Sequence, residues 1–217
     1  SSKTICSNNT VSYTITSLTL NASFTWTASE LTPPTGGNIT GFSDCASGCG
    51  NIIGQTLVNS GTSTGVVRYV ITPTGPSPAF CPGTPFNFDV TVQPVAVVQA
   101  TPPSATICGG TGPGINLTSS TTGSVNYVWT ASLVSGTATG FSSSNGSTIN
   151  QTLSNSTNSP ATVRYVVTPR IGAANCPGTP INVDVIVNPK GNVTQPLNQV
   201  VCNSAPTSVS FSTANTG

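Results

Sequence analysis

Short runs in which apolar and polar residues alternate occur along the whole chain. They lie at residues 11–16, 22–27, 52–58, 66–72 and 86–93, and they are rich in Val, Ile, Tyr and Thr. Alternation with a period of two residues is typical of half-buried β-strands, and clusters of Gly, Pro, Asn and Ser separate the runs. No segment of about ten residues has helical periodicity. The pattern therefore predicts an all-β chain of immunoglobulin-like antiparallel β-sandwiches.

The same pattern occurs twice. V-R-Y-V-x-T-P, C-P-G-T-P and N-x-D-V-x-V fill residues 67–92 and return about 95 residues later, at 163–187. We therefore predict one sandwich repeat at residues 1–95 and a second at 96–190. Residues 191–217 resemble the opening of a repeat, and we predict that they begin a truncated third one.

Composition limits the classes of function. Charged residues make up 4% of the chain, compared with roughly 25% in ordinary soluble domains, and the formal net charge is +1. So few basic residues cannot follow a phosphate backbone, which argues against a nucleic-acid partner. The sequence has no apolar run of about 18 residues, so we expect no membrane insertion in this segment.

Seven cysteines indicate an oxidising, extracellular compartment. Each repeat has one cysteine before its first strand and one in the C-P-G-T-P loop. We therefore predict disulfides between Cys6 and Cys81 and between Cys108 and Cys176. Such a bridge would tie the opening of a repeat to the loop before its last strand.

The remaining cysteines have no counterpart in both repeats. Cys45 and Cys49 occur in the first repeat only, and we predict a local disulfide between them. A C-x-x-x-C spacing without histidine fits zinc poorly and differs from the C-x-x-C redox motif. Cys202 is left over, and we expect it to bond a cysteine in the remainder of the third repeat.

The few charges also recur. Arg68 and Asp89 lie on strands that one loop joins, and Arg164 and Asp184 occupy the same places in the second repeat. We predict a cross-strand ion pair in each repeat, whose main effect would be to fix strand register, because exposed ion pairs stabilise little.

Residues for catalysis are scarce. The chain has no histidine and only four carboxylates, two of which belong to the predicted ion pairs. This composition excludes Ser-His-Asp and Cys-His systems and offers no convincing carboxylate pair for glycoside hydrolysis or calcium cage. We expect no catalytic residue, no metal site, no cofactor and no enzymatic activity.

The aromatic residues fit the core of a sandwich. Trp26 and Trp129 occupy corresponding strands, and Tyr69 and Tyr165 lie on a late strand. A platform for stacking sugars would need exposed rings, so we interpret these side chains as structural.

The shared motifs, T-W-T-A-S, T-G-F, Q-T-L-x-N, V-R-Y-V-x-T-P and C-P-G-T-P, resemble tandem PKD-like, immunoglobulin-type domains. Such domains occur in very large secreted surface proteins of Bacteroidota, including SprB-type gliding-motility adhesins exported by the type IX pathway. The resemblance covers essentially the whole chain and implies a cell-surface stalk whose adhesive region lies elsewhere. Within that family, no catalytic residues exist to carry over.

Three functions remain open at this stage. The first is a structural stalk repeat of a surface adhesin or filament, with neighbouring repeats of the same chain as partners. The second is a module that binds glycans or other surface proteins, for which the loop at residues 41–52 is the best candidate. The third is an accessory domain of a large secreted enzyme.

Overall fold

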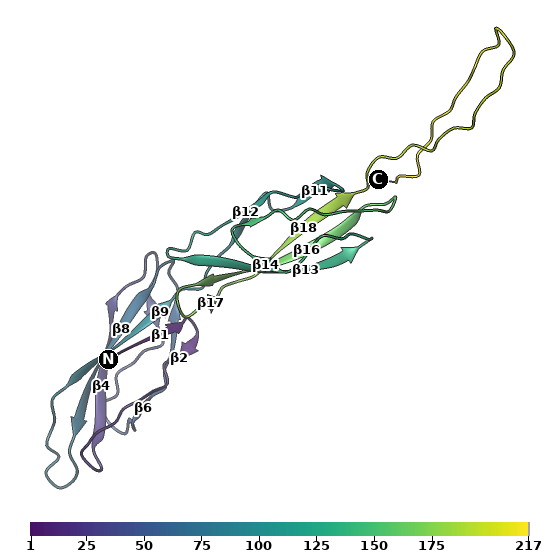
Figure 1. The fold of residues 1–217 in the computed structure, drawn as a ribbon. Coiled ribbons are helices and arrows are strands. Elements are labelled where there is room, and N and C mark those ends of the chain that lie inside the picture. Colours follow the sequence, from purple (N-terminus) through teal and green to yellow (C-terminus); the bar gives the residue numbers. More distant parts are fainter. Residues whose placement is uncertain (217) are drawn as a thin grey trace. The chain divides into compact units, whose positions relative to one another are not determined.

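The computed structural model describes residues 1–216, which form β-strands joined by loops and turns (Figure 1). No helix occurs within that range. The predicted all-β, immunoglobulin-like class is therefore confirmed. The alternation that predicted strands is visible in the structure, because buried and partly exposed residues alternate along the longest strands of both repeats.

Nine strands form the first repeat, most of them in the segments that the pattern predicts. They are β1 (Ser2–Cys6), β2 (Asn9–Thr10), β3 (Tyr13–Thr14), β4 (Ser23–Thr32), β5 (Ile39–Thr40), β6 (Ile52–Ile53), β7 (Thr56–Asn59), β8 (Gly65–Thr74) and β9 (Phe86–Gln93).

Nine further strands follow. They are β10 (Gln99–Thr101), β11 (Ala105–Cys108), β12 (Ile115–Thr118), β13 (Val125–Ser135), β14 (Ser144–Asn145), β15 (Thr148–Ile149), β16 (Ala161–Ile171), β17 (Cys176–Pro177) and β18 (Ile181–Asn188).

The core of the first repeat lies between a main sheet and shorter strand pairings. The main sheet has the order β1-β9-β8-β4, and β2-β7-β5 and β3-β6 form the other layer. Side chains from both layers belong to one buried cluster, which includes Trp26, Leu57, Val67, Tyr69 and Phe88. Burial of this apolar surface is the main source of stability that a sandwich of this size has.

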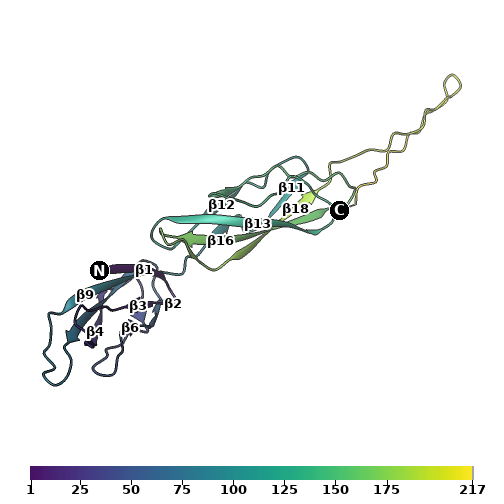
Figure 2. The same cartoon turned by 60° about the horizontal axis from the view of Figure 1, so that its bottom comes forward.

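The second repeat follows the same plan. Its main sheet has the order β11-β18-β16-β13-β14, with β17 paired to β16, and β10-β12-β15 form a smaller sheet. These long strands run side by side in the turned view (Figure 2). Trp129, Tyr165 and Val185 are among its buried residues.

The opening strand of each repeat pairs in parallel with its neighbour, which departs from the purely antiparallel pairing that the sequence predicted. Strand β1 pairs with β9 in parallel, with Ser2 opposite Asp89 and Cys6 opposite Gln93. Strand β11 pairs with β18 in the same way, and Cys108 lies opposite Asn188. Each opening cysteine therefore lies beside the C-terminal end of the last strand of its repeat.

The chain forms two compact units whose limits differ from the predicted repeats. The first contains residues 1–98, 119–127 and 168–180, and the second contains residues 99–118, 128–167 and 181–217. Residues 119–127 and 168–180 belong to the second repeat by sequence and include β17 and one end each of β13 and β16, yet they form part of the first compact unit.

Residues 191–216 contain little regular structure. A single antiparallel bridge joins Thr194 to Ser212, and the Asn215 amide donates a hydrogen bond to the Lys190 carbonyl. The assignment of 191–217 to a third repeat stays a prediction.

Candidate functional site

A disulfide joins Cys45 to Cys49, as the local spacing predicted, with Cα atoms 5.8 Å apart. The loop that it closes lies along β4, because the backbone groups of Trp26 and Cys45 exchange two hydrogen bonds of 2.8 and 2.9 Å. Asp44 adds a further contact, since its Oδ1 accepts a hydrogen bond from the Ala28 amide at 2.7 Å. The loop at residues 41–52 is therefore held on the edge of the sheet.

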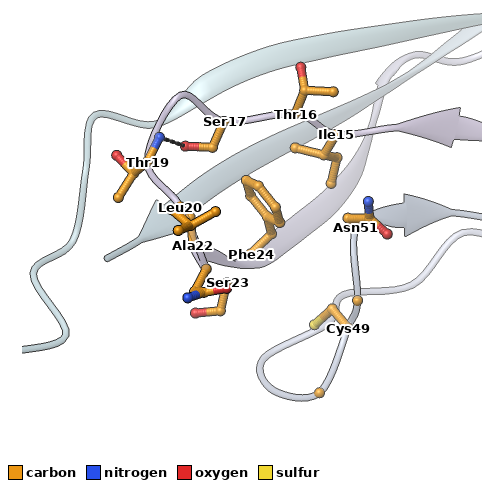
Figure 3. A pocket seen from close by; sticks show the side chains of 13 residues that line it. Ile15, Thr16, Ser17, Thr19, Leu20, Ala22, Ser23, Phe24, Cys49 and Asn51 are labelled. Atoms are coloured by element: carbon orange, nitrogen blue, oxygen red, sulfur yellow. Dashed lines mark hydrogen bonds between the residues drawn. The ribbon is translucent and has the colours of Figure 1, made fainter. Parts of the chain in front are cut away.

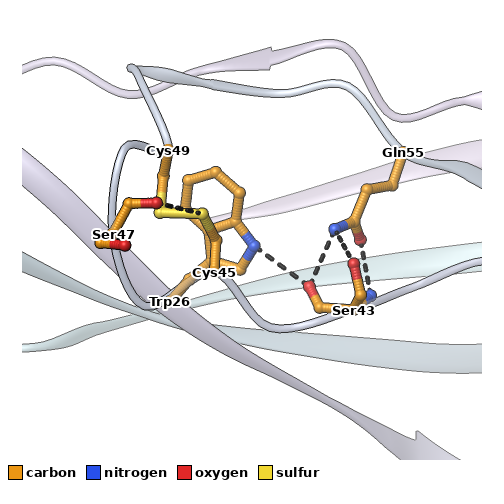
Figure 4. The surroundings of a disulfide bond; sticks show 6 residues. All are labelled: Trp26, Ser43, Cys45, Ser47, Cys49 and Gln55. Atoms are coloured by element: carbon orange, nitrogen blue, oxygen red, sulfur yellow. Dashed lines mark hydrogen bonds between the residues drawn. A yellow bond between two sulfur atoms is a disulfide. The ribbon is translucent and has the colours of Figure 1, made fainter.

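The tryptophans point into the cores. Trp26 is 6% exposed and its Nε1 donates to the Ser43 carbonyl at 3.2 Å (Figure 4). Trp129 is 5% exposed, and its Nε1 has no hydrogen-bond partner among the described residues. Neither ring presents a face to solvent on which a sugar could stack.

A cavity of about 600 Å³ lies beside the disulfide loop (Figure 3). Ile15 and Phe24 form its apolar floor, the segment at 16–23 forms one wall, and residues 48–51 form another. Its polar groups are hydroxyls and the Asn21 and Asn51 amides, and no charged side chain lines it. This chemistry suits a neutral, hydroxyl-rich ligand better than an ionic one.

The predicted pairing of the repeated cysteines is wrong. Cys6 bonds Cys176, which is 170 residues away, with Cα atoms 5.4 Å apart. Cys6 lies beside the C-terminal end of β9, whereas Cys81 precedes the N-terminal end of this eight-residue strand. About 26 Å of strand therefore separates Cys6 from Cys81, far more than the roughly 7 Å between Cα atoms that a disulfide permits.

The same geometry prevents a bond between Cys108 and Cys176, because Cys108 lies at the far end of β18. Within residues 1–216, Cys81, Cys108 and Cys202 are exposed and unpaired. The described residues do not test the predicted bond of Cys202 to a cysteine of a third repeat, and the Cys6–Cys176 bond shows that an opening-strand cysteine can bond a cysteine outside its own repeat.

Cys176 is held in the first compact unit by the loop around it. It is 1% exposed and packs with Ala96 and Ile171. The neighbouring Thr179 amide donates to the Ala96 carbonyl at 3.1 Å. A side chain on Gly178 would collide with that same carbonyl, so glycine is required for the close approach.

The ion pairs lie where the sequence places them. Arg68 and Asp89 face each other across β8 and β9, and two hydrogen bonds of 2.7 Å join the guanidinium to the carboxylate. Arg164 and Asp184 repeat this arrangement with the same two distances. Hydrogen bonds from the arginines lower the pKa of Asp89 and of Asp184.

A second repeated network, centred on the glutamine of Q-T-L-x-N, is not apparent from the sequence. Gln55 accepts from the Tyr69 hydroxyl at 2.8 Å and donates to the Ser43 carbonyl at 2.8 Å. Gln151 makes the corresponding bonds to Tyr165 at 3.1 Å and to the Ser142 carbonyl at 3.0 Å. In the sequence, the sign of this network is that the glutamine recurs at the same place in both repeats.

The asparagine of the same motif is buried. The Asn59 amide donates 2.9 Å hydrogen bonds to the carbonyls of Ser63 and Val92, and the Asn155 amide donates 2.8 Å bonds to those of Ser159 and Val187. Each asparagine thus ties a turn to the last strand of its repeat. Buried polar groups that are bonded in this way specify one packing arrangement.

Burial also affects the tyrosines. It raises the pKa of Tyr165 to about 12 and raises the pKa of Tyr69 further. Both hydroxyls therefore remain protonated donors to their glutamines in the folded state.

No group of three or more His, Cys, Asp or Glu side chains gathers in the described part of the chain. No helix between residues 1 and 216 has the length and apolar character needed to cross a membrane.

These features define a chain of tandem β-sandwich repeats in which the repeated polar side chains form hydrogen bonds within their own repeat. A family model described as "PKD-like domain" matches residues 3–96 and 105–191, and the chain belongs to this family.

Comparison with curated proteins gives no match. Among solved structures, the chain is similar to human CDH23 EC21-23, with 14% identity and a TM-score of 0.30, over 100% of this chain and 84% of that one. It is also similar to human mucin-like protocadherin EC1-2, with 10% identity and a TM-score of 0.31, over 87% of this chain and 95% of that one.

Proposed function

We propose that this chain is a pair of structural repeats in the stalk of a large secreted adhesin or filament of a bacterial surface. One observation carries the proposal: the polar residues of the shared motifs are used for internal bonding in both repeats. Arginine, aspartate, glutamine, asparagine and tyrosine of these motifs all bond other parts of their own repeat. Residues that recur for internal bonding support a spacer rather than a recognition surface.

The extracellular setting follows from physical and family arguments. Disulfides persist in oxidising compartments, and the chain has two of them in its described part. PKD-like domains are also typical of extracellular proteins. The motif resemblance extends the proposal to the surface proteins of Bacteroidota, with export by the type IX pathway and a role in gliding motility.

We also propose that these repeats are not enzymatic. The chain lacks histidine, and two of its four carboxylates are engaged by arginines. The other two, Glu30 and Asp44, accept hydrogen bonds from backbone amides that hold local loops. Each carboxylate therefore has a structural partner.

Pulling single molecules from both ends tests the mechanical part of the proposal. In reduced protein, each compact unit should resist extension and open in a discrete event. In oxidised protein, the Cys6–Cys176 bond should prevent the residues between them from extending. Reduction should add about 600 Å of contour length, since extended chain spans roughly 3.5 Å per residue. Smooth extension without force peaks would contradict a stalk role.

The cavity beside the 41–52 loop favours a second candidate function, binding of a neutral glycan. Titration with a panel of neutral oligosaccharides tests it. A bulky substitution on the cavity wall, Ser23→Trp, should abolish binding, whereas Asn126→Trp, at the corresponding place in the second repeat, should have no effect. Absence of binding to the unaltered chain would leave the stalk function alone.

A further inference from the structure

The Cys6–Cys176 disulfide joins cysteines of different sequence repeats. Cys6 ends the opening strand of the first repeat, and Cys176 begins the C-P-G-T-P loop of the second. Both lie in the first compact unit. The bond therefore has a direction along the chain, from the opening strand of one repeat to the loop of the repeat that follows.

Cys108 stands in the second repeat where Cys6 stands in the first. Each ends an opening strand that pairs in parallel with the last strand of its repeat. The residue after each cysteine also makes the same backbone bond: the Ser7 amide donates to the Gln93 carbonyl at 3.0 Å, and the Gly109 amide donates to the Asn188 carbonyl at 2.9 Å. Cys108 is thus placed like Cys6, but it has no partner in the described chain.

Cys81 corresponds to Cys176 in the same way. In both loops the glycine of C-P-G-T-P donates to the carbonyl of a proline on the preceding strand at 2.8 Å, Gly83 to Pro73 and Gly178 to Pro169. The two loops therefore have the same backbone anchor. Cys176 is buried, whereas Cys81 is exposed.

The surroundings of Cys81 also indicate a missing neighbour. Every residue from 76 to 85 is exposed, and Phe80 has 60% of its surface in solvent. Phe80 adopts a φ of 47°, a left-handed conformation that is unusual for a bulky residue, and its counterpart Asn175 has a φ of 54°. The loop around Cys81 therefore has the same backbone shape as the buried loop around Cys176. The apolar ring of Phe80 beside it, however, stays exposed to solvent.

We propose that Cys108 and Cys81 are the two halves of further bonds of the Cys6–Cys176 kind. Cys108 would bond the C-P-G-T cysteine of the repeat that follows in the natural chain, and Cys81 would bond the opening-strand cysteine of the repeat that precedes. The partners are repeats of the same chain because the bond that the structure contains joins consecutive repeats. The inference rests on the proposed function, since it requires a stalk of more than two repeats.

The chemistry is oxidation of two thiols to one disulfide. The two sulfurs form a bond and release two protons and two electrons. A small disulfide such as oxidised glutathione accepts both electrons and both protons and leaves as two thiols. Both Cys81 and Cys108 are exposed, so the exchange needs no unfolding.

Non-reducing peptide mapping of the full natural chain tests the proposal. The peptide containing Cys108 should be joined to a peptide with a C-P-G-T sequence from a later repeat. The peptide containing Cys81 should be joined to one from the opening strand of an earlier repeat. A free Cys108, a Cys81–Cys108 bond, or a bond to a second chain would overturn the proposal.

Thiol counting in variants of the same full chain gives an independent readout. Cys108→Ser should expose one new thiol, located in the following repeat, and Cys81→Ser should expose one in the preceding repeat. Cys45→Ser is the matched control and should expose only Cys49. No new thiol with Cys108→Ser would overturn the inference, whereas the proposed function would fail separately if the folded units showed no resistance to pulling.

Discussion

Cys6 and Cys176 are bonded with their Cα atoms 5.4 Å apart, although 170 residues separate them in sequence. The bond closes a loop that contains most of the chain. Cys45 and Cys49, by contrast, are four positions apart. These two disulfides should therefore differ greatly in their effect on stability.

Removal of the long-range disulfide should destabilise the first compact unit by about 2–5 kcal/mol, because a long closed loop restricts the unfolded chain most. Removal of the short one should cost about 2 kcal/mol or less in the same entropic account. Thermal unfolding of Cys6→Ser/Cys176→Ser and of Cys45→Ser/Cys49→Ser would compare them. Equal shifts in Tm would contradict the expectation.

Acid should weaken the fold through Asp89 and Asp184. Hydrogen bonds from their arginines lower the pKa of both carboxyl groups in the folded state. The unfolded chain then binds more protons, so this stabilisation is complete above the ordinary pKa of 3.8 and is lost as the pH falls through the lower folded value. Urea midpoints measured against pH should decline below about pH 4.

The double variant Asp89→Asn/Asp184→Asn provides the comparison for that experiment. It should show a weaker decline in acid than the unaltered chain, because the two coupled carboxyl groups are gone. An identical acid profile would show that the ion pairs do not contribute to this pH dependence.

Alkali should act through the buried tyrosines. Burial raises the pKa of Tyr165 to about 12 and that of Tyr69 further, whereas tyrosines in an unfolded chain ionise near pH 10. The resulting stabilisation is complete below about pH 10 and is lost as the pH rises toward the folded values. Tyrosinate absorbance should therefore appear in two steps, the second coinciding with unfolding.

Substitution by phenylalanine removes the hydroxyl group of each tyrosine and keeps its ring, so it isolates the effect of the hydroxyl. Tyr69→Phe/Tyr165→Phe should cost about 1 kcal/mol per lost hydrogen bond near neutral pH. It should also diminish the second absorbance step, to which Tyr127 still contributes because burial raises its pKa as well. If the step keeps its full amplitude in the double variant, Tyr69 and Tyr165 are not its source.

The glycine of the T-G-F motif should not tolerate alanine. Gly41 and Gly140 have φ angles of 92° and 90°, and an added Cβ would collide with the carbonyls of Thr56 and Thr152. Gly41→Ala should destabilise the first repeat by about 2 kcal/mol or more. Gly54→Ala, where no atom lies within 4 Å of the new Cβ, should change stability by less than about 0.5 kcal/mol. Chemical denaturation of both variants would check the contrast.

The sequence predicted features that depend on neighbouring strands. The alternation of apolar and polar residues predicted the strands. The recurring Arg68 and Asp89 predicted the ion pair, because one loop joins β8 to β9. The pairing of Cys6 could not be obtained in this way. It depends on the parallel placement of β1 beside β9 and on packing of the Cys176 loop against Ala96, neither of which leaves a periodic signal.

The recurrence of Gln55 and Asn59 was visible, but their partners were not. A glutamine in Q-T-L-x-N could face solvent as well as a tyrosine, since only the fold determines which hydroxyl lies 2.8 Å from it. The loop with Cys45 and Cys49 could be recognised as closed by a disulfide, whereas the cavity beside it depends on residues 15–24 from another segment.

The parallel pairing of β1 with β9 determines how the first repeat would respond to tension. Ser2 lies opposite Asp89 and Cys6 opposite Gln93, so the chain enters β1 at one end of the pair and leaves β9 at the other. When the Cys6–Cys176 bond is reduced, force applied to these two ends acts along the strands, and all the hydrogen bonds of the pair must shear together. A hairpin pulled from its open end unzips one bond at a time. Strands β11 and β18 have the same geometry, so each repeat contains its own mechanical clamp.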